Sequence, residues 1–189
     1  QTQKVFFDKG LGKVVKKEPK KRPISYAAHV DSHIYSYYCE KLSKAYEDHL
    51  GKVPWSSSIL AFRSLGKSNI DFARDAFLDI SVRDSSCVIA IDIKGFFENL
   101  NHAHLKKSWQ TLLGTSTMPD DDYAVYRSLT KYSFVNRDQV YEVLGLSKNN
   151  PKNGRKRICE PQKFREKVRN GGLIETNKLN KGIPQGSPI

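Results

Sequence analysis

The most informative residues of this chain are Lys181-Gly182-Ile183-Pro184-Gln185-Gly186-Ser187-Pro188-Ile189. They form a run rich in glycine and proline that carries one side-chain amide. Glycine lets a backbone approach another group closely, and the amide of Gln185 can both donate and accept hydrogen bonds. These residues therefore predict a loop made for close contact with a ligand.

A second informative segment lies upstream, at Cys87-Val88-Ile89-Ala90-Ile91-Asp92-Ile93-Lys94-Gly95-Phe96-Phe97-Glu98-Asn99-Leu100-Asn101-His102. Its apolar first half predicts a strand that is covered on both faces. Asp92 ends this strand beside a glycine turn, which is a typical position for a metal ligand, and hard carboxylate oxygens suit Mg²⁺. From the spacing alone, an Asp that makes only local hydrogen bonds is the commoner case.

In this order the two segments resemble the A and B motifs of reverse transcriptases. The resemblance implies that Asp92 binds two Mg²⁺ ions, with Mn²⁺ as an alternative, and that the backbone carbonyl of Ile93 helps to hold one. It implies that the ring of Phe97 excludes the 2′-hydroxyl of ribonucleotides, with a core aromatic as the alternative. It also implies that Gln185 and Gly186 contact the incoming nucleotide.

Looser matches extend the resemblance toward the N-terminus. Arg63 and Lys67 match basic residues that grip the triphosphate in the family, although ordinary surface charge explains them equally well. Arg22-Pro23-Ile24-Ser25-Tyr26 and Leu129-Thr130-Lys131-Tyr132 look most like the bacterial defence-associated reverse transcriptases, which protect against phage. The partners implied are an RNA template, with a structured non-coding RNA as one candidate, deoxynucleotides and a DNA product.

One departure from the family is the lack of its Tyr-x-Asp-Asp motif in these residues. Two-metal phosphoryl transfer needs ligands for two ions about 3.5–4 Å apart, and Asp92 cannot hold both unaided. We therefore expect the family's remaining carboxylates to lie beyond Ile189, and the chain alone to be inactive as a polymerase. The alternatives are a non-catalytic polymerase-like RNA-binding module and, more distantly, an RNA-templated RNA polymerase, which Phe97 disfavours.

The charge of the chain favours a polyanionic partner. Its formal net charge is +12, and phosphate binding by Lys and Arg is driven by counterion release. Basic residues concentrate in residues 1–22 and 148–169, each of which is either a nucleic-acid contact or a solvated surface. The predicted nucleic-acid-binding residues are Arg22, Lys152, Arg155, Lys156 and Arg157.

The remaining composition fits a globular protein without a membrane span. Hydrophobic residues make up 38% and charged residues 28%, and no apolar run approaches the length of a transmembrane helix. The three cysteines are odd in number and far apart, so they suggest neither a disulfide framework nor a zinc site. We expect a cytoplasmic protein, and the sequence leaves its oligomeric state open.

The predicted fold class is α+β, with the fingers and an incomplete palm of a right-hand polymerase, in which helices pack on a small, mostly antiparallel sheet. Predicted helices span residues 31–50, 69–83, 102–113, 120–131 and 137–144, and another begins at 161. Predicted strands span 59–63 and 87–93, and a hairpin turns at 176–177. The predicted divisions are a basic arm (1–22), fingers (23–86), a palm segment (87–113), helices with a basic region (114–180) and the final loop (181–189).

Overall fold

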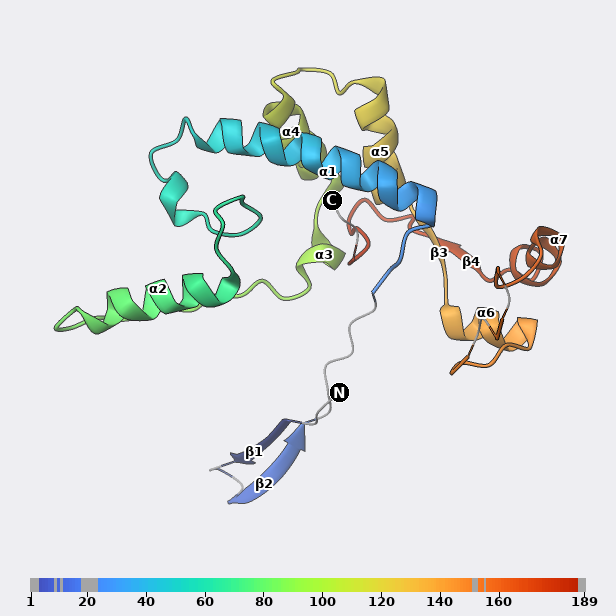
Figure 1. Ribbon diagram of the computed structural model, residues 1–189, viewed down its shortest axis with the longest axis horizontal. Coiled ribbons are helices and arrows are strands. Elements are labelled where there is room, and N and C mark those ends of the chain that lie inside the picture. Colours follow the sequence, from blue (N-terminus) through green and yellow to red (C-terminus); the bar gives the residue numbers. More distant parts are fainter. Residues whose placement is uncertain are drawn as a thin grey trace.

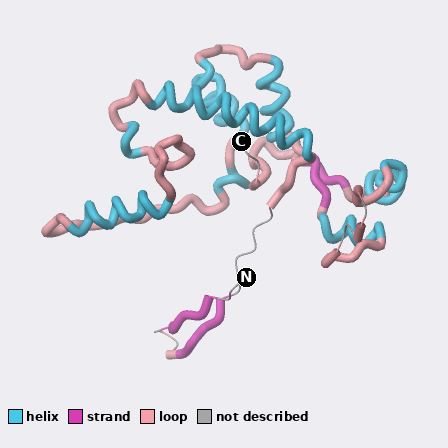
Figure 2. Tube along the Cα trace, viewed as in Figure 1, coloured by secondary structure: helices cyan, strands magenta, loops and turns pink. Residues whose placement is uncertain are grey.

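The computed structural model describes residues 4–8, 10, 12–17, 24–150, 153–154 and 156–186. Helices predominate, and the described strands form two separate antiparallel pairs, which confirms the predicted α+β class (Figure 1 and Figure 2). In chain order the elements are β1 (Lys4–Asp8), β2 (Lys13–Lys17), α1 (His29–Leu50), the 3₁₀ helix η1 (Ser56–Ser58), α2 (Asn69–Ser81), α3 (Phe96–Asn99), α4 (His102–Leu113), α5 (Asp120–Thr130), β3 (Ser133–Val135), α6 (Arg137–Leu144), α7 (Pro161–Phe164), the π-helix η2 (Arg165–Arg169) and β4 (Ile174–Thr176).

The main core lies between three helices, which we call the helical platform. Helix α1 lies across α4 and α5, whereas α2 extends away from them (Figure 1). The platform is built on helices packed against one another, so the expectation that helices cover a sheet is wrong for this part of the chain. Its buried apolar cluster comprises Tyr38, Trp109, Met118, Val125, Tyr126 and Leu129.

A buried carboxylate joins the three helices of the platform. Asp122 is fully buried, and it accepts hydrogen bonds from Trp109 Nε1 at 3.1 Å and from Lys41 Nζ at 2.7 Å. Next to it, Asp121 accepts a 2.8 Å hydrogen bond from the hydroxyl of Tyr38. Burial, together with this bond, raises the pKa of Tyr38 to about 12. The carboxylate of Asp122 thus accepts hydrogen bonds from both α1 and α4, so the position of these two helices relative to each other is fixed.

A second, smaller core lies in residues 136–173, which we call the inserted lobe. The lobe begins after β3 and ends before β4. These two strands pair with each other, and Phe134 lies opposite Glu175. Figure 1 shows α6 and α7 set apart from the platform beyond this strand pair. The buried residues of the lobe are Val140, Leu144 and Val168, with Tyr141, Leu146, Ile158, Cys159 and Leu173 packed against them.

Most predicted helices are confirmed, because residues near their ends specify where they begin and end. Ser68 and Asp71 form a capping box at the start of α2, and the side chain of Asn136 caps α6. Helix α1 begins at His29, two residues before the predicted start at residue 31, and its N-cap Ala28 makes no side-chain cap. Pro161 opens a helix as predicted, although it continues as a π-helix through Arg169.

The predicted strand at 87–93 is wrong. The structure has no strand there, and Ile89, Ile91 and Ile93 are exposed. A strand needs a neighbour for its backbone hydrogen bonds, and none of the described strands pairs with this segment. The predicted strand at 59–63 is also absent, because the chain turns there through Phe62, whose φ is +57°.

Two further expectations for strands are corrected by long-range pairing. The predicted hairpin around 176–177 does not form, because β4 pairs instead with β3, which lies far upstream. Within the predicted basic arm, β1 and β2 form an antiparallel hairpin that the sequence analysis did not predict. Among the described residues, no helix combines the length and the apolar character that a membrane crossing requires.

The platform should depend on Asp122. We expect Asp122→Ala to lower the free energy of unfolding by about 3 kcal/mol, because it leaves Lys41 and the indole of Trp109 without their acceptor. Chemical denaturation followed by far-UV circular dichroism measures the change. The matched control is Asp120→Ala, which removes an exposed carboxylate from the same first turn of α5 and should cost less than about 1 kcal/mol. Equal losses in the two variants would contradict the role given to Asp122.

Candidate functional site

The two sequence segments singled out above lie side by side in the structure. The amide of Gly182 donates to the carbonyl of Leu100, and the amide of Ile183 donates to that of Phe97, both at 2.9 Å. The side chain of Lys181 adds a 2.8 Å hydrogen bond to Asn99. Residues 181–186, which we call the PQG loop, therefore dock onto the short helix α3, which begins four residues after Asp92, and onto the residue that follows it.

A buried histidine, His102, anchors the PQG loop by a hydrogen bond. The imidazole of His102 is 6% exposed, and its Nε2 lies 2.7 Å from the carbonyl oxygen of Gly182. Since a carbonyl only accepts, the proton must be on Nε2. The backbone amide of His102 donates to Asn180, and its carbonyl accepts from the hydroxyl of Tyr126 in the platform. The loop is thereby tied to the main core.

Asn177 is the second anchor of the PQG loop. Its Nδ2 lies within 3.0–3.2 Å of the carbonyl oxygens of Thr130, Lys181 and Gly182. The neighbouring Lys131 donates to the carbonyl of Leu179 at 3.0 Å. The end of α5 is thus joined to the approach of the loop, and β4 delivers Asn177 to this junction.

Two glycines in the loop are required by close backbone approach. Gly182 has a φ of +87°, and a Cβ there would lie 3.0 Å from the carbonyl oxygen of Glu98. Gly186 has a φ of +108°, and a Cβ there would lie 2.8 Å from both Ile24 Cγ2 and the carbonyl oxygen of Ser25. The amide of Ser25 also donates to the carbonyl of Gln185 at 2.8 Å. The segment at 24–25 therefore closes the loop from its other side.

Asp92, the predicted catalytic residue, is exposed and precedes the turn at Lys94–Gly95. It makes no hydrogen bond or ion pair with another described residue, and the backbone carbonyl of Ile93, the other predicted ligand, accepts no hydrogen bond from one. Across the described ranges, no group of three or more His, Cys, Asp or Glu side chains is placed to hold a metal. The described residues therefore supply one carboxylate and do not complete a two-ion magnesium site.

The two adjacent aromatic rings after Asp92 differ in environment. Phe96 is 47% exposed, whereas Phe97 is half-buried, and their rings meet edge to face at 5.6 Å. Gly95 starts this short helix with a φ of +65°. Phe97 is therefore held on both sides: its ring by Phe96 and its carbonyl by the PQG loop. Gln185 is half-buried in that loop.

The two basic residues predicted to grip a triphosphate are engaged within the fold. Arg63 donates to both carboxylate oxygens of Glu47 and, at 2.7 Å, to the carbonyl of Ser56, and this pairing keeps the pKa of Glu47 below its usual value. Lys67 lies 2.7 Å from Asp75 in an exposed ion pair. The structure does not bring either residue together with Asp92 through any described contact, and a triphosphate would have to compete with these carboxylates.

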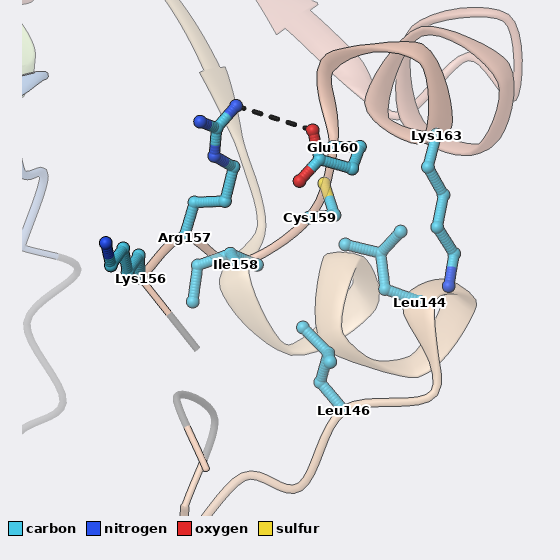
Figure 3. A pocket seen from close by; sticks show the side chains of 8 residues that line it. All are labelled: Leu144, Leu146, Lys156, Arg157, Ile158, Cys159, Glu160 and Lys163. Atoms are coloured by element: carbon cyan, nitrogen blue, oxygen red, sulfur yellow. Dashed lines mark hydrogen bonds and ion pairs between the residues drawn. The ribbon is translucent and has the colours of Figure 1, made fainter. Parts of the chain in front are cut away.

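The predicted nucleic-acid-binding residues fall in two regions. Lys156 and Arg157 are exposed on the inserted lobe, where they line a pocket of about 360 Å³ (Figure 3). Arg157 is 3.4 Å from Glu160. The other three predicted residues, Arg22, Lys152 and Arg155, lie outside the described residues.

Sequence reasoning missed the two residues that position the site, His102 and Asn177. His102 was read only as the start of a helix, and Asn177 only as part of a turn. Each binds backbone carbonyls far away in sequence, and such contacts leave no periodic signal.

No protein-family model matches the chain, and no curated protein is similar to it.

The docked state of the PQG loop should depend on Asn177. We expect Asn177→Ala to speed hydrogen exchange at the amides of Gly182 and Ile183 by about tenfold, because each lost hydrogen bond is worth about 1 kcal/mol. Exchange followed by mass spectrometry or NMR measures this change. Asn180→Ala is the matched control, since its side chain makes only a 3.4 Å contact with Lys131. Unchanged protection in Asn177→Ala would refute the anchor.

Proposed function

We propose that this chain forms the fingers and the first half of the palm of an RNA-directed DNA polymerase that acts in bacterial defence against phage. The observation that carries the proposal is the docking of the PQG loop on α3, the short helix downstream of Asp92, through the bonds of Gly182 to Leu100 and of Ile183 to Phe97. The amide-bearing loop is thereby brought from a distant part of the sequence to the segment that carries Asp92 and Phe97. This set suits the binding of a nucleoside triphosphate next to a metal ligand.

In this proposal each residue has a separate task. Asp92 and the carbonyl of Ile93 are the proposed ligands of Mg²⁺, which would supply charge stabilisation at the transferring phosphate. Further carboxylates would come from beyond Ile189. Phe97 would press against C2′ of the sugar, and Gln185 would contact the sugar or the base edge. The proposed template is RNA, and the proposed location is the cytoplasm.

Several features support nucleic acid as the partner and leave a second function open. The chain carries a net charge of +12, and its basic residues are concentrated in residues 1–22 and 148–169. A non-catalytic RNA-binding module would use the same charge without Asp92. The two functions differ in one measurable way, since only the polymerase requires the carboxylate.

Asp92 should be essential for nucleotide incorporation. In a protein extended past Ile189, we expect Asp92→Asn to reduce primer extension on an RNA template by about 100-fold or more, because the shape is kept while the charge that holds metal is lost. The matched control is Asp84→Asn, an exposed carboxylate in the same segment, which should retain activity. Full extension by Asp92→Asn would exclude Asp92 from the reaction. RNA binding without extension by any variant would favour the binding module.

Phe97 should select the sugar. We expect Phe97→Val to raise the ratio of ribonucleotide to deoxynucleotide incorporation by about tenfold, because the smaller side chain leaves room beside C2′. Single-nucleotide extension with each substrate gives the ratio. Phe96→Val removes the neighbouring, more exposed ring and serves as the control. A ratio that is the same in both variants would make Phe97 a packing residue.

A further inference from the structure

The inserted lobe carries much of the positive charge of the chain. Residues 136–173 contain ten Lys or Arg against four Asp or Glu, a net +6 of the total +12. The lobe needs little of this charge for its own core, which is apolar. Arg165 and Arg169, on the π-helix, are exposed and make no ion pair with any other residue that the structure describes. They are free to bind an anion.

A groove of about 1510 Å³ separates the lobe from the rest of the chain. Its walls come from the lobe, from the β3–β4 pair, from α1 and α5, and from the segment at 24–28. Arg165 and Arg169 line it on the lobe side, and Lys131 lines it on the other. Among the acidic residues of the walls, Asp138 is neutralised by ion pairs with Arg137 and Lys148. Of the described residues that line the groove, the other acids are Asp31 and Glu175.

Exposed aromatic rings face the same groove. Tyr26 is 90% exposed, Phe134 is 40% exposed and Phe164 is 36% exposed, and all three line the groove. They come from three different elements, so no single helix face explains them. A ring left open to water in a groove offers a flat apolar surface, and nucleobases stack on such surfaces irrespective of their sequence.

The smaller pocket of the lobe adjoins the groove and also combines apolar and cationic side chains. It shares Ile158 and Cys159 with the groove, so the two hollows adjoin. Figure 3 shows Leu144 and Leu146 on its apolar side and the cationic side chains of Lys156 and Lys163 around it. At about 360 Å³ it falls at the small end of ligand pockets. The rim also holds Glu160, which is paired with Arg157 at 3.4 Å, so Lys156 and Lys163 leave it net cationic. An apolar floor with such a rim suits a single unstacked base whose phosphate remains outside.

We infer that the inserted lobe and the wall facing it clamp a single-stranded polynucleotide, with bases stacked on Tyr26, Phe134 and Phe164 and phosphates held by Arg165 and Arg169. Stacking platforms combined with cations that track a backbone are the chemistry of single-strand binding. A duplex presents the same phosphates but keeps its bases stacked on one another. The inference assigns a partner to a surface formed without Asp92 or Phe97, and it does not require polymerase activity.

The test measures binding by the full chain, without Mg²⁺ or nucleotides, by fluorescence anisotropy over a series of salt concentrations. The probes are a labelled 12-nucleotide RNA, the DNA of the same sequence, and the corresponding RNA duplex. We expect either or both single strands to bind more tightly than the duplex, and a preference between them identifies the sugar that is recognised. A duplex bound as tightly as both single strands would overturn the inference.

Two pairs of variants separate the charges from the rings. Arg165→Gln with Arg169→Gln should lower the slope of log affinity against log salt by about 1.4, which corresponds to two phosphate contacts on a single strand. The charge-matched control is Lys44→Gln with Lys52→Gln, an exposed residue in the C-terminal half of α1 and another in the turn that follows it; neither lines the groove. Identical slopes in both double variants would overturn the role of the arginines.

The ring variants are Phe134→Ala with Phe164→Ala and, separately, Tyr26→Ala. Each should weaken single-strand binding roughly five- to hundredfold with little change in the salt slope. Tyr26 is almost fully exposed, so its removal tests stacking without risk to the fold. The control is Phe77→Ala, an exposed ring on α2. Unchanged affinity in both ring variants would refute stacking in the groove.

Asp92→Asn separates this inference from the proposed function. It should leave single-strand binding unchanged, since Asp92 does not line the groove. Loss of primer extension with binding retained is the result expected if both proposals hold. If the unaltered protein that continues past Ile189 does not extend a primer, while binding still depends on the groove, only the polymerase proposal is contradicted. If it extends a primer, but the groove variants do not affect binding, only the clamp is contradicted.

Discussion

The structure depends on one buried carboxylate, Asp122. It has no exposed surface, and a buried charge is tolerated only when its hydrogen bonds are satisfied. Lys41 and Trp109 satisfy it from α1 and α4, and the bond to Asp122 raises the pKa of Lys41. Because the lysine is partly exposed, its charge keeps contact with water while the carboxylate does not. The three helices can therefore adopt only arrangements in which these donors meet.

The candidate site is built on this platform through a short series of contacts. The indole of Trp109 meets the ring of Tyr126 edge to face at 6.4 Å, and the hydroxyl of Tyr126 binds the carbonyl of His102. His102 then binds Gly182 in the PQG loop. A loop rich in glycine has little conformational preference of its own. Its position relative to Asp92 is therefore set by neighbours that are fixed in the core.

The predictable parts of the fold are those whose cause is local. Ser68 and Asp71 specify the start of α2 within four residues, and Asn136 does the same for α6. The strand expected at 87–93 failed because strand formation depends on a partner that the segment itself does not contain. The pairing of β3 with β4 was missed for the same reason. It brackets the inserted lobe, so the groove could not be foreseen either.

The sequence by itself determined most of the helices and the net charge of +12. It also contains the motifs that point to Asp92, Phe97 and the PQG loop. Spacing, capping and side-chain chemistry are properties of neighbouring residues, so they can be read without a fold. Only the tertiary structure decided that the PQG loop docks on α3, downstream of Asp92, and that Arg63 is engaged by Glu47. It also decided that aromatic and basic side chains of the lobe face one groove. Such contacts join residues far apart in the chain, and their free energy appears only when the core has brought them together.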